Sequence, residues 1–195
     1  MKTLKEIEKM LEEVLTTSRF QHTLGVMYTS GALAMKYNVD LDKAMLAGLL
    51  HDCAKCLSID EQKQLCRENG ISLSESEEKN PALIHAKLGS YLAKTKYEVT
   101  DEDVLNAIAY HTTGRPNMTI LEEILYVADY IEPARHHAEN LPFVRRLAFE
   151  NIEQCMLQIS GDILHYLQNN QNSIIDVLTK DTYEFYKNQL GLEEK

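Results

Sequence analysis

Turn-forming residues, tryptophan and basic residues are all scarce in this sequence. Its 195 residues include only 8 glycines and 4 prolines, and tryptophan is absent. An all-β sandwich or barrel needs frequent turns, so this composition argues against that class. Lysine and arginine number 20 against 30 aspartates and glutamates, which gives a formal net charge of −10. Because nucleic acids and anionic membranes are bound mainly through lysine and arginine, neither is expected as a partner.

Long apolar runs are also missing, and no secretory leader is expected. No segment approaches the roughly 18 consecutive apolar residues of a membrane span. The first residues, Met1 to Glu6, lack the apolar core of a signal peptide. The four cysteines, Cys53, Cys56, Cys66 and Cys155, do not have the spacing of a disulfide-rich secreted domain. We therefore expect a cytoplasmic protein.

What is present indicates one helical domain. Apolar residues make up 44% of the chain and charged residues 26%, which are values of a globular protein. The apolar residues have helical spacing nearly everywhere, and they predict an all-α fold of about eight or nine helices. Residues 71–80 are expected to be a polar loop. A long helical stretch is expected over 142–167, with Gly161 as a candidate bend, and a last helix over about 173–190. The other expected helix starts are Leu4, Ser18, Asp40, Ser58, Pro81, Thr100 and Thr119.

Four histidines and two aspartates lie on the apolar faces or at the ends of different predicted helices. They are His22, His51, Asp52, His85, His111 and Asp129. A single histidine on an apolar face is more often a core residue than a ligand. Asp129 is harder to explain, because it lies within the apolar run 125–131 and a buried carboxylate needs a cation, a metal or several donors. Neutral imidazoles and carboxylates are good ligands for divalent transition metals. We therefore expect the six side chains to converge on one interior site.

The order of these residues resembles that of the HD-domain metal-dependent phosphohydrolases, in which a His…His-Asp…Asp pattern holds one divalent metal. The residues that match this pattern are His22, His51, Asp52 and Asp129. His85 and His111 resemble the extra pair of a subset that binds a second metal, with Asp52 as the bridge. The resemblance therefore implies a metal site, with one or two ions, inside a helical bundle.

Five sequence blocks are similar, in order and spacing, to those of the bacterial YqeK family. They are Arg19–Val26, His51–Lys55, His85–Gly89, His111–Gly114 and Ala128–Arg135. One departure is Ala134, where a glycine is expected before the arginine. The resemblance implies a single HD-type domain over 1–195, with a metal-site core at 19–135 and a helical C-terminal part at 140–190. It also implies the activity of that family, which hydrolyses diadenosine tetraphosphate symmetrically to two ADP using iron.

This chemistry assigns further roles to individual residues. Hydrolysis of a phosphoanhydride needs an oxygen nucleophile in line with the leaving group and positive charge on the transferring oxygens, and two metal ions supply both. Asp52 is the expected bridge between the ions and hence the catalytic residue. His85 and His111 either ligate the second metal or, if only one ion is present, donate hydrogen bonds to phosphate.

Three cations and one hydroxyl are candidates for holding the phosphates. Arg19, Lys55 and Arg135 lie beside the matching blocks, and each can form charge-assisted hydrogen bonds to a phosphate. The alternative for any single lysine or arginine is an exposed, solvated position. Thr112 either donates its hydroxyl to a phosphate or caps the helix that ends beside it.

Several alternatives stay open on the sequence. One alternative to the tetraphosphate hydrolase is another HD-type nucleotide phosphohydrolase, such as a nucleoside monophosphatase or a guanosine-tetraphosphate hydrolase. A second alternative is a nucleotide-sensing module without catalysis. Mixed histidine and carboxylate sites accept iron, manganese, cobalt or zinc, so iron rests on the resemblance alone. Cys53 and Cys56 form a CxxC without a second pair, and we expect buried thiols rather than a zinc or redox site. A homodimer through the late amphipathic helices and a monomer are both compatible with the pattern.

Overall fold

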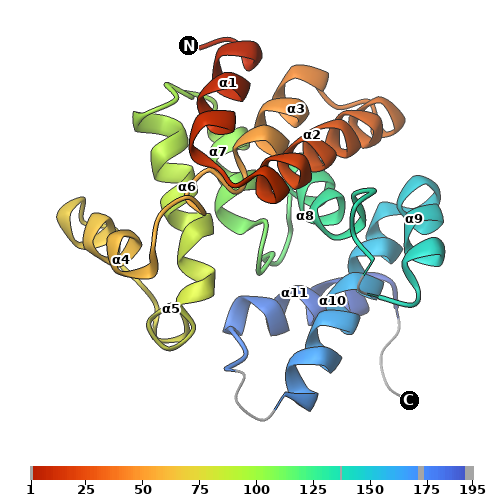
Figure 1. Cartoon of the computed structure of the whole chain (residues 1–195). Coiled ribbons are helices and arrows are strands. Elements are labelled where there is room, and N and C mark those ends of the chain that lie inside the picture. Colours follow the sequence, from red (N-terminus) through yellow and green to blue (C-terminus); the bar gives the residue numbers. More distant parts are fainter. Residues whose placement is uncertain (1, 137, 171–173, 192–195) are drawn as a thin grey trace.

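The computed structural model describes residues 2–136, 138–170 and 174–191, and every regular element within these ranges is a helix (Figure 1). The all-α prediction is confirmed, although these ranges contain eleven α-helices instead of eight or nine. The elements are α1 Leu4–Val14, α2 Thr17–Tyr37, α3 Leu41–Leu50, α4 Ile59–Glu68, α5 Glu75–Lys79, the short 3-10 helix η1 Pro81–Leu83, α6 Ile84–Thr95, α7 Glu102–Tyr110, α8 Ile120–Ile131, α9 Leu141–Glu150, α10 Ile152–Asn169 and α11 Val177–Gln189.

Side-chain caps set most helix starts where the sequence predicts them. Asp40 caps α3, and Ser58 and Thr119 each form a capping box at the start of α4 and α8. The helix α2 differs, because Thr16 rather than Ser18 accepts the hydrogen bond from the first turn. A threonine two residues upstream therefore starts this helix earlier than expected.

The polar segment 71–80 is not simply a loop. Ser74 and Glu77 form a capping box that starts α5, and Glu77 is buried with one oxygen 2.7 Å from the ammonium of Lys87. A capping box and one ion pair thus form a short helix in an acidic segment that, from its composition, is expected to be an exposed loop.

The long late stretch is divided at a different residue from the one expected. Asn151 has an extended backbone that ends α9, and its side chain caps α10, whereas Gly161 lies inside α10. Because an asparagine cap offers an alternative to the intrahelical hydrogen bond, it interrupts an apolar pattern that continues across it. The expected start of the last helix at Ser173 lies outside the described residues, and α11 begins at Val177.

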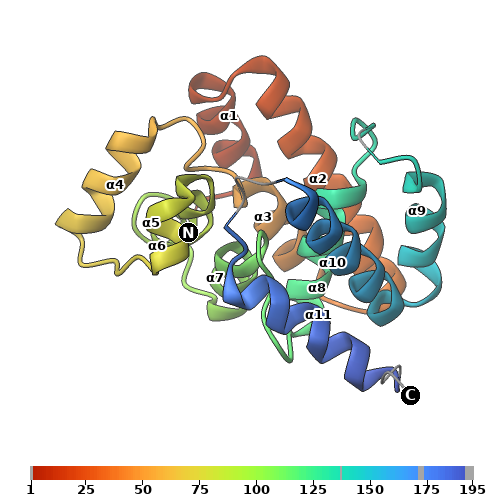
Figure 2. The same ribbon diagram turned by 90° about the horizontal axis from the view of Figure 1, so that it is seen from below.

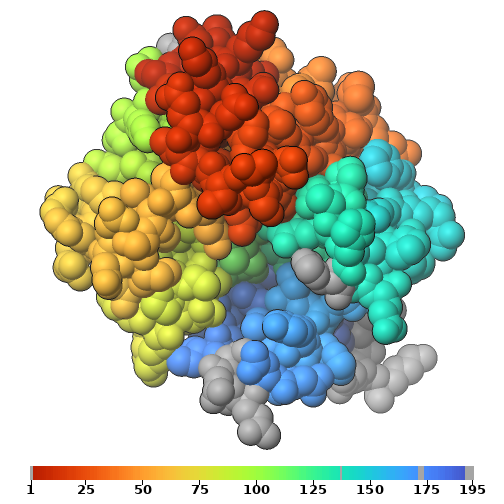
Figure 3. All heavy atoms as spheres, viewed as in Figure 1, coloured from red at the N-terminus to blue at the C-terminus, as the bar shows by residue number. Residues whose placement is uncertain are grey.

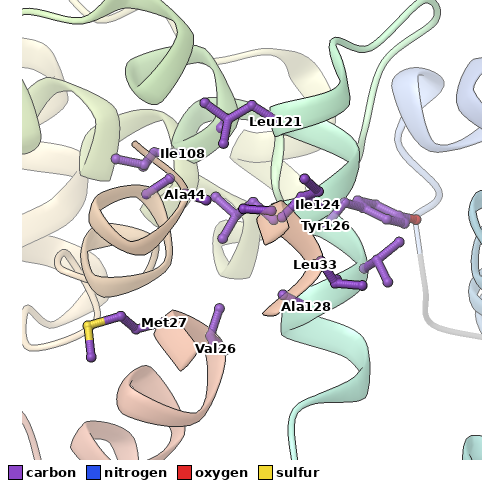
Figure 4. Close-up of a cluster of buried hydrophobic side chains, with 14 of the residues drawn as sticks. Val26, Met27, Leu33, Ala44, Ile108, Leu121, Ile124, Tyr126 and Ala128 are labelled. Atoms are coloured by element: carbon purple, nitrogen blue, oxygen red, sulfur yellow. The ribbon is translucent and has the colours of Figure 1, made fainter. Parts of the chain in front are cut away.

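Four helices form the framework on which the rest is built. The helix α2 contacts α3 and α8, and α7 contacts both α3 and α8. Figure 4 shows their shared core, where Leu33, Ala44, Ile108 and Ile124 are fully buried. On the other side of α8, α10 and α11 lie together, as the view in Figure 2 shows. Such a densely packed frame holds side chains that project from it in fixed positions.

None of the described helices is both long enough and apolar enough to cross a membrane.

A buried carboxylate on α8 makes the stability of this fold depend on pH. Glu123 is buried, and Tyr186 of α11 donates a hydrogen bond of 2.6 Å to its Oε1. Burial raises the pKa of Glu123 from 4.5 to about 7, although the Tyr186 hydrogen bond opposes this. Since the folded-state pKa is above the unfolded one, the folded protein keeps the proton between these values, and stability falls as the pH rises through that window.

We therefore expect the wild type to lose about 1–3 kcal/mol of unfolding free energy relative to Glu123→Gln between pH 5 and pH 8. Urea denaturation at the two pH values measures this difference. Glu150→Gln is the matched control, because the side chain of Glu150 is 61% exposed. A Glu123→Gln protein whose stability follows the wild type at both pH values would contradict the expectation.

Candidate metal centre

All six predicted ligand residues meet at one point, where α2, α3, α6, α7 and α8 converge. His51 and His111 end α3 and α7, and Asp52 follows His51 directly. The four histidines and Asp52 are buried, whereas the Asp129 side chain is 24% exposed. The centre therefore lies inside the bundle and is open to solvent on the side of Asp129.

A glycine permits the close contact of helices that brings the first two histidines together. A Cβ atom at position 48 would lie only 2.7 Å from the Cα of Met27 on α2. With Gly48 at this position, α3 approaches the backbone of α2, and the Nε2 atoms of His22 and His51 are 3.2 Å apart. The apolar segment before His51 is thus built for contact between helices.

Asp52 turns one carboxylate oxygen toward each pair of histidines. Its Oδ2 lies 3.4 Å from His51 Nε2 and 3.8 Å from His22 Nε2. Its Oδ1 lies 3.2 Å from His85 Nε2 and 3.8 Å from His111 Nε2. The centre therefore has two halves that share one carboxylate.

Asp129 completes the half that contains His22 and His51. Its Oδ1 lies 3.1 Å from His22 Nε2 and 3.9 Å from His51 Nε2. The other half has its own pair of imidazoles, whose Nε2 atoms are 3.2 Å apart. Two overlapping sets of three ligand atoms lie within 4.8 Å of one another, namely His22, His51 and Asp129, and His51, Asp52 and His111.

Hydrogen bonds on the outer side of the imidazole rings determine which ring nitrogen directs its lone pair toward the centre. Three histidines donate from Nδ1 to the carbonyl three residues earlier in the chain, at 2.6–2.7 Å. These bonds run from His51 to Gly48, from His85 to Ala82 and from His111 to Ile108. A carbonyl oxygen only accepts, so Nδ1 carries a proton, and in the neutral imidazole the lone pair is on Nε2.

This arrangement fits a bound cation. The neutral His85 and His111 rings have their Nε2 lone pairs 3.2 Å apart and cannot form a hydrogen bond with each other, and the Asp52 oxygen beside them only accepts. Positive charge between these acceptors removes the repulsion. Neutral imidazoles whose second nitrogen is held by a carbonyl or carboxylate are the usual ligands of a divalent transition metal. The His/Asp groups of this centre are thus able to hold a metal ion.

The ionisation states point the same way. Burial raises the pKa of Asp52 and Asp129, but the neighbouring imidazoles outweigh burial and hold both pKa values below the ordinary range. Burial lowers the pKa of His85 to about 3 and also lowers that of His111. Burial would lower the pKa of His51 too, but Asp52 and Asp129 outweigh it and raise the value. A metal ion therefore competes with a proton mainly at His51.

The three predicted cations surround the centre, but they differ in their partners. Arg19 Nη1 lies 2.7 Å from Asp52 Oδ2, and Arg135 Nη2 lies 2.6 Å from Asp129 Oδ1. Lys55 is half-buried, and no ion pair within 4 Å joins it to the residues that the structure describes. Burial lowers its pKa, while the charge of Asp52 raises it. Of these three cations, Lys55 is thus the one that has no carboxylate partner among the described residues.

Thr112 lies at the centre itself. Its hydroxyl is 3.3 Å from His111 Nε2 and 3.4 Å from His85 Nε2. His111, not Thr112, is the C-terminal cap residue of α7. The hydroxyl therefore lies beside the predicted ligands and faces the same half of the centre as the two histidines.

The CxxC is only partly as expected. Cys53 is buried and directs its thiol toward the carbonyl of Gly89 at 3.5 Å, and burial raises its pKa. Cys56 is exposed, which corrects the expectation of two buried thiols. The chain turns after Asp52 instead of continuing α3, so the two cysteines do not lie on one helix face.

One buried carboxylate at the centre was not predicted from the sequence. Glu132 follows α8, is 2% exposed, and has Oε1 3.1 Å from His22 Nδ1, while its Oε2 accepts from the backbone of Ala134. A Cβ atom at Gly25 would lie 2.6 Å from that Oε2. The sequence signal for this buried carboxylate is its position between the apolar residue Ile131 and Pro133.

Arg145 on α9 was also missed, and nothing in its spacing marks it. Its guanidinium donates to the backbone carbonyls of Ile131, Glu132 and Arg135 at 2.8–3.0 Å. These bonds hold the segment that carries Glu132 and Arg135. The late helices therefore contribute to the geometry of the centre.

A hollow lies in the middle of the face seen in Figure 3, between α6 on one side and α10 on the other. A cavity of about 1080 Å³ is lined by residues of α8, including Asp129, by residues of α10, and by His111, Thr112 and Arg135. The centre thus opens into a space of the size that accommodates a small-molecule ligand.

Comparisons with known proteins agree with this geometry. The HD domain family matches residues 19–134. Two curated relatives are named symmetrical bis(5'-nucleosyl)-tetraphosphatases. The Bacillus subtilis protein is 40% identical over 83% of this chain and 86% of its own length, and the Halalkalibacterium halodurans protein is 38% identical over 96% of each chain.

A crystal structure of a Clostridium acetobutylicum protein, described as a predicted HD superfamily hydrolase involved in NAD metabolism, has the same fold. It is 36% identical, has a TM-score of 0.92, and the match covers 97% of this chain and 99% of that one. The HD match includes all six residues of the centre, and the relatives align over most of their length. The chain therefore belongs to the HD-domain family and, within it, to the YqeK group.

Proposed function

We propose that this protein hydrolyses diadenosine tetraphosphate symmetrically to two ADP. The curated relatives named above carry this activity in their names. The observation that carries the proposal is the position of Asp52, which faces one histidine pair with each carboxylate oxygen. A centre with two halves around a shared carboxylate suits the cleavage of a phosphoanhydride.

In this proposal Asp52, His22, His51 and Asp129 hold a divalent metal, and His85 and His111 hold a second ion or donate to phosphate. Divalent ions in such a site supply positive charge for phosphoryl oxygens and make a water nucleophile available at neutral pH. The burial of the imidazoles keeps bulk water from competing for their lone pairs. Asp52 is the catalytic residue, because both halves of the centre depend on it.

The cations around the centre hold the tetraphosphate. Arg19 and Arg135 each orient one proposed ligand carboxylate and keep further guanidinium N–H groups for a phosphate. Lys55 supplies a charge that no carboxylate of the described residues pairs with within 4 Å, and Thr112 supplies a hydroxyl donor. ADP leaves when a phosphorus next to the central bridging oxygen is attacked, so the substrate must lie with the middle of its bridge at the centre.

We further propose iron as the metal and residues 1–195 as one domain. Mixed imidazole and carboxylate ligands accept ferrous ion, and the resemblance to the YqeK family implies it. The single domain is supported by Arg145, because this residue of the part at 140–190 holds the carbonyls of the segment that ends the core at 19–135.

Product analysis tests the proposed function. The purified protein, loaded anaerobically with ferrous ion, is incubated with diadenosine tetraphosphate, and the nucleotides are separated by chromatography. We expect ADP as the only product. AMP with ATP would overturn the cleavage position, and release of inorganic phosphate would indicate a monophosphatase. Nucleotide binding without turnover across ferrous, manganous, cobaltous and zinc ions would indicate a sensing module.

Glu132 is expected to support metal binding through His22. In Glu132→Gln the amide has one acceptor oxygen where the carboxylate has two. The His22 ring and the backbone N–H of Ala134, which each bind one oxygen of Glu132, then compete for it. We expect the affinity for Co²⁺ to fall by about 10–100-fold, as for other partners of metal-bound histidines. Titration followed by the visible spectrum of the cobalt ion measures this affinity independently of turnover.

The exposed Glu150 again offers the control, as Glu150→Gln. Thermal unfolding of both apo proteins shows whether the fold is intact. Equal cobalt affinities for the two variants would show that Glu132 does not act on the metal site.

A further inference from the structure

A second, smaller cavity lies next to the metal centre and is not used by the proposed chemistry. Its volume is about 450 Å³, and it lies between α5, the start of α6, the end of α7 and the segment that leads into α11. Its apolar lining consists mainly of Leu83, Ala86, Tyr110, Ile175, Val177 and Leu178. Thr112 lines both this cavity and the larger one. The two cavities therefore share Thr112, whose hydroxyl lies beside His85 and His111.

The charges of the smaller cavity argue against a phosphate in it. It has two lysines in its lining, Lys79 and Lys87, and both are already paired with carboxylates. Lys79 forms an ion pair with Glu75, and Lys87 lies 2.7 Å from Glu77. The remaining polar groups are mainly hydroxyls and the carboxylate of Asp176. An apolar cavity with hydroxyls and no unpaired cation suits a neutral, flat group such as a nucleoside.

The larger cavity has features that suit a nucleoside as well. Tyr126 on α8 lines it, is 3% exposed, and its hydroxyl has no hydrogen-bond partner among the described residues. A buried hydroxyl without a partner is costly unless a ligand or water satisfies it. Tyr166 on α10 lines the same cavity and is 68% exposed, so its ring is available to stack on a base.

We propose that the two cavities hold the two nucleosides of one dinucleotide, the first in the larger cavity and the second in the smaller one, with the phosphate bridge passing Thr112. This inference rests on the proposed function. Symmetric cleavage places the central bridging oxygen at the centre, so equal lengths of bridge must leave it in two directions. The cations Arg19, Lys55 and Arg135 surround the middle of this path, and the smaller cavity, whose lysines are paired with carboxylates, lies at one end.

Filling the smaller cavity tests the proposal. Leu83→Trp adds a bulky ring to a half-buried lining position, while Ile59→Trp adds the same ring to α4, where the side chain is 42% exposed and lines neither cavity. We expect Leu83→Trp to raise KM for diadenosine tetraphosphate at least about tenfold, since contacts to one base are lost. Ile59→Trp is expected to keep the wild-type KM. Equal KM values for the two folded variants would overturn the proposal.

A substrate analogue with a single nucleoside separates the second nucleoside from the phosphates. Adenosine 5′-tetraphosphate keeps the bridge but lacks the second nucleoside, and its inhibition constant against diadenosine tetraphosphate hydrolysis is measured in each variant. We expect Leu83→Trp to change this constant less than about twofold. A parallel rise in both constants would mean that the substitution harms the phosphate site, and this too would overturn the proposal. If the wild type forms no ADP from diadenosine tetraphosphate, the proposed function fails first and independently of these variants.

A fluorescent reporter gives a readout that does not need turnover. The native chain has no tryptophan, so Val177→Trp places a single indole at the rim of the smaller cavity, where the side chain is 65% exposed. We expect the analogue with a methylene group in place of the central bridging oxygen to change the emission of this variant and not that of Ile59→Trp. An unchanged emission at concentrations that inhibit hydrolysis would contradict the second nucleoside site.

Discussion

Replacing Asp52 by asparagine is expected to reduce the turnover of diadenosine tetraphosphate by about a thousandfold or more, a change of roughly 4 kcal/mol in the activation free energy. The amide keeps the shape of the side chain, but it turns one of the two acceptor oxygens into a donor. Each oxygen faces its own histidine pair, at 3.4 Å from His51 and 3.2 Å from His85, so one half of the centre loses its shared ligand. Initial rates measured with ferrous ion, together with the metal content of the protein, check this expectation.

Asp42→Asn is the control for this variant, because Asp42 is an exposed residue of α3, the helix that precedes Asp52, and lies outside the centre. Its rate should equal that of the wild type. Asp52→Asn should still unfold cooperatively, because the helices around it are held by their own apolar core. A near-normal rate of Asp52→Asn at full metal content would rule out the assignment of Asp52 as the shared ligand.

Replacing Lys55 by alanine is expected to lower kcat/KM by about 10–100-fold, which corresponds to the loss of one charge-assisted hydrogen bond in a partly buried site. Metal content should not change. Unlike Arg19 and Arg135, which bind the carboxylates of Asp52 and Asp129, Lys55 has no such pair. Its removal therefore takes charge from the phosphate without releasing a proposed metal ligand. Steady-state kinetics and metal analysis of the same preparation check both parts.

Lys55→Arg and Lys36→Ala complete this test. The arginine keeps the charge and should recover most of the lost kcat/KM, whereas alanine at Lys36, an exposed residue of α2, should have no effect. If Lys55→Ala loses metal together with activity, the lysine acts on the centre and not on the phosphate.

The framework of the fold could be predicted because its signals are local. Asp40, Ser58 and Thr119 cap the helices that they were expected to cap, and the apolar spacing identifies the buried faces. The convergence of the six predicted ligand residues could be expected for a related reason, since each polar group interrupts an apolar face. What could not be predicted depends on single capping groups, such as Asn151, which divides one expected helix into two.

The supporting contacts of the centre lie beyond local sequence patterns. His22 and Glu132 are 110 positions apart, and no spacing rule connects them. Arg145 donates to backbone carbonyls, and because every residue has a carbonyl, the sequence does not show which ones an arginine will bind. Cys56 is exposed because the chain turns after Asp52, a change of direction that its sequence neighbours do not mark. Long-range geometry, and not residue type, determines these positions.

The contact between Gly25 and Glu132 has a consequence for how this sequence can diverge. A methyl group at position 25 would occupy the place of the Glu132 carboxylate, 2.6 Å from its Oε2. Alanine at position 25 therefore requires the Glu132 carboxylate to leave its place beside His22, or a shorter acid such as aspartate at position 132. Among homologues, a change at position 25 should thus be accompanied by a change at position 132, although the two positions lie near opposite ends of the HD segment.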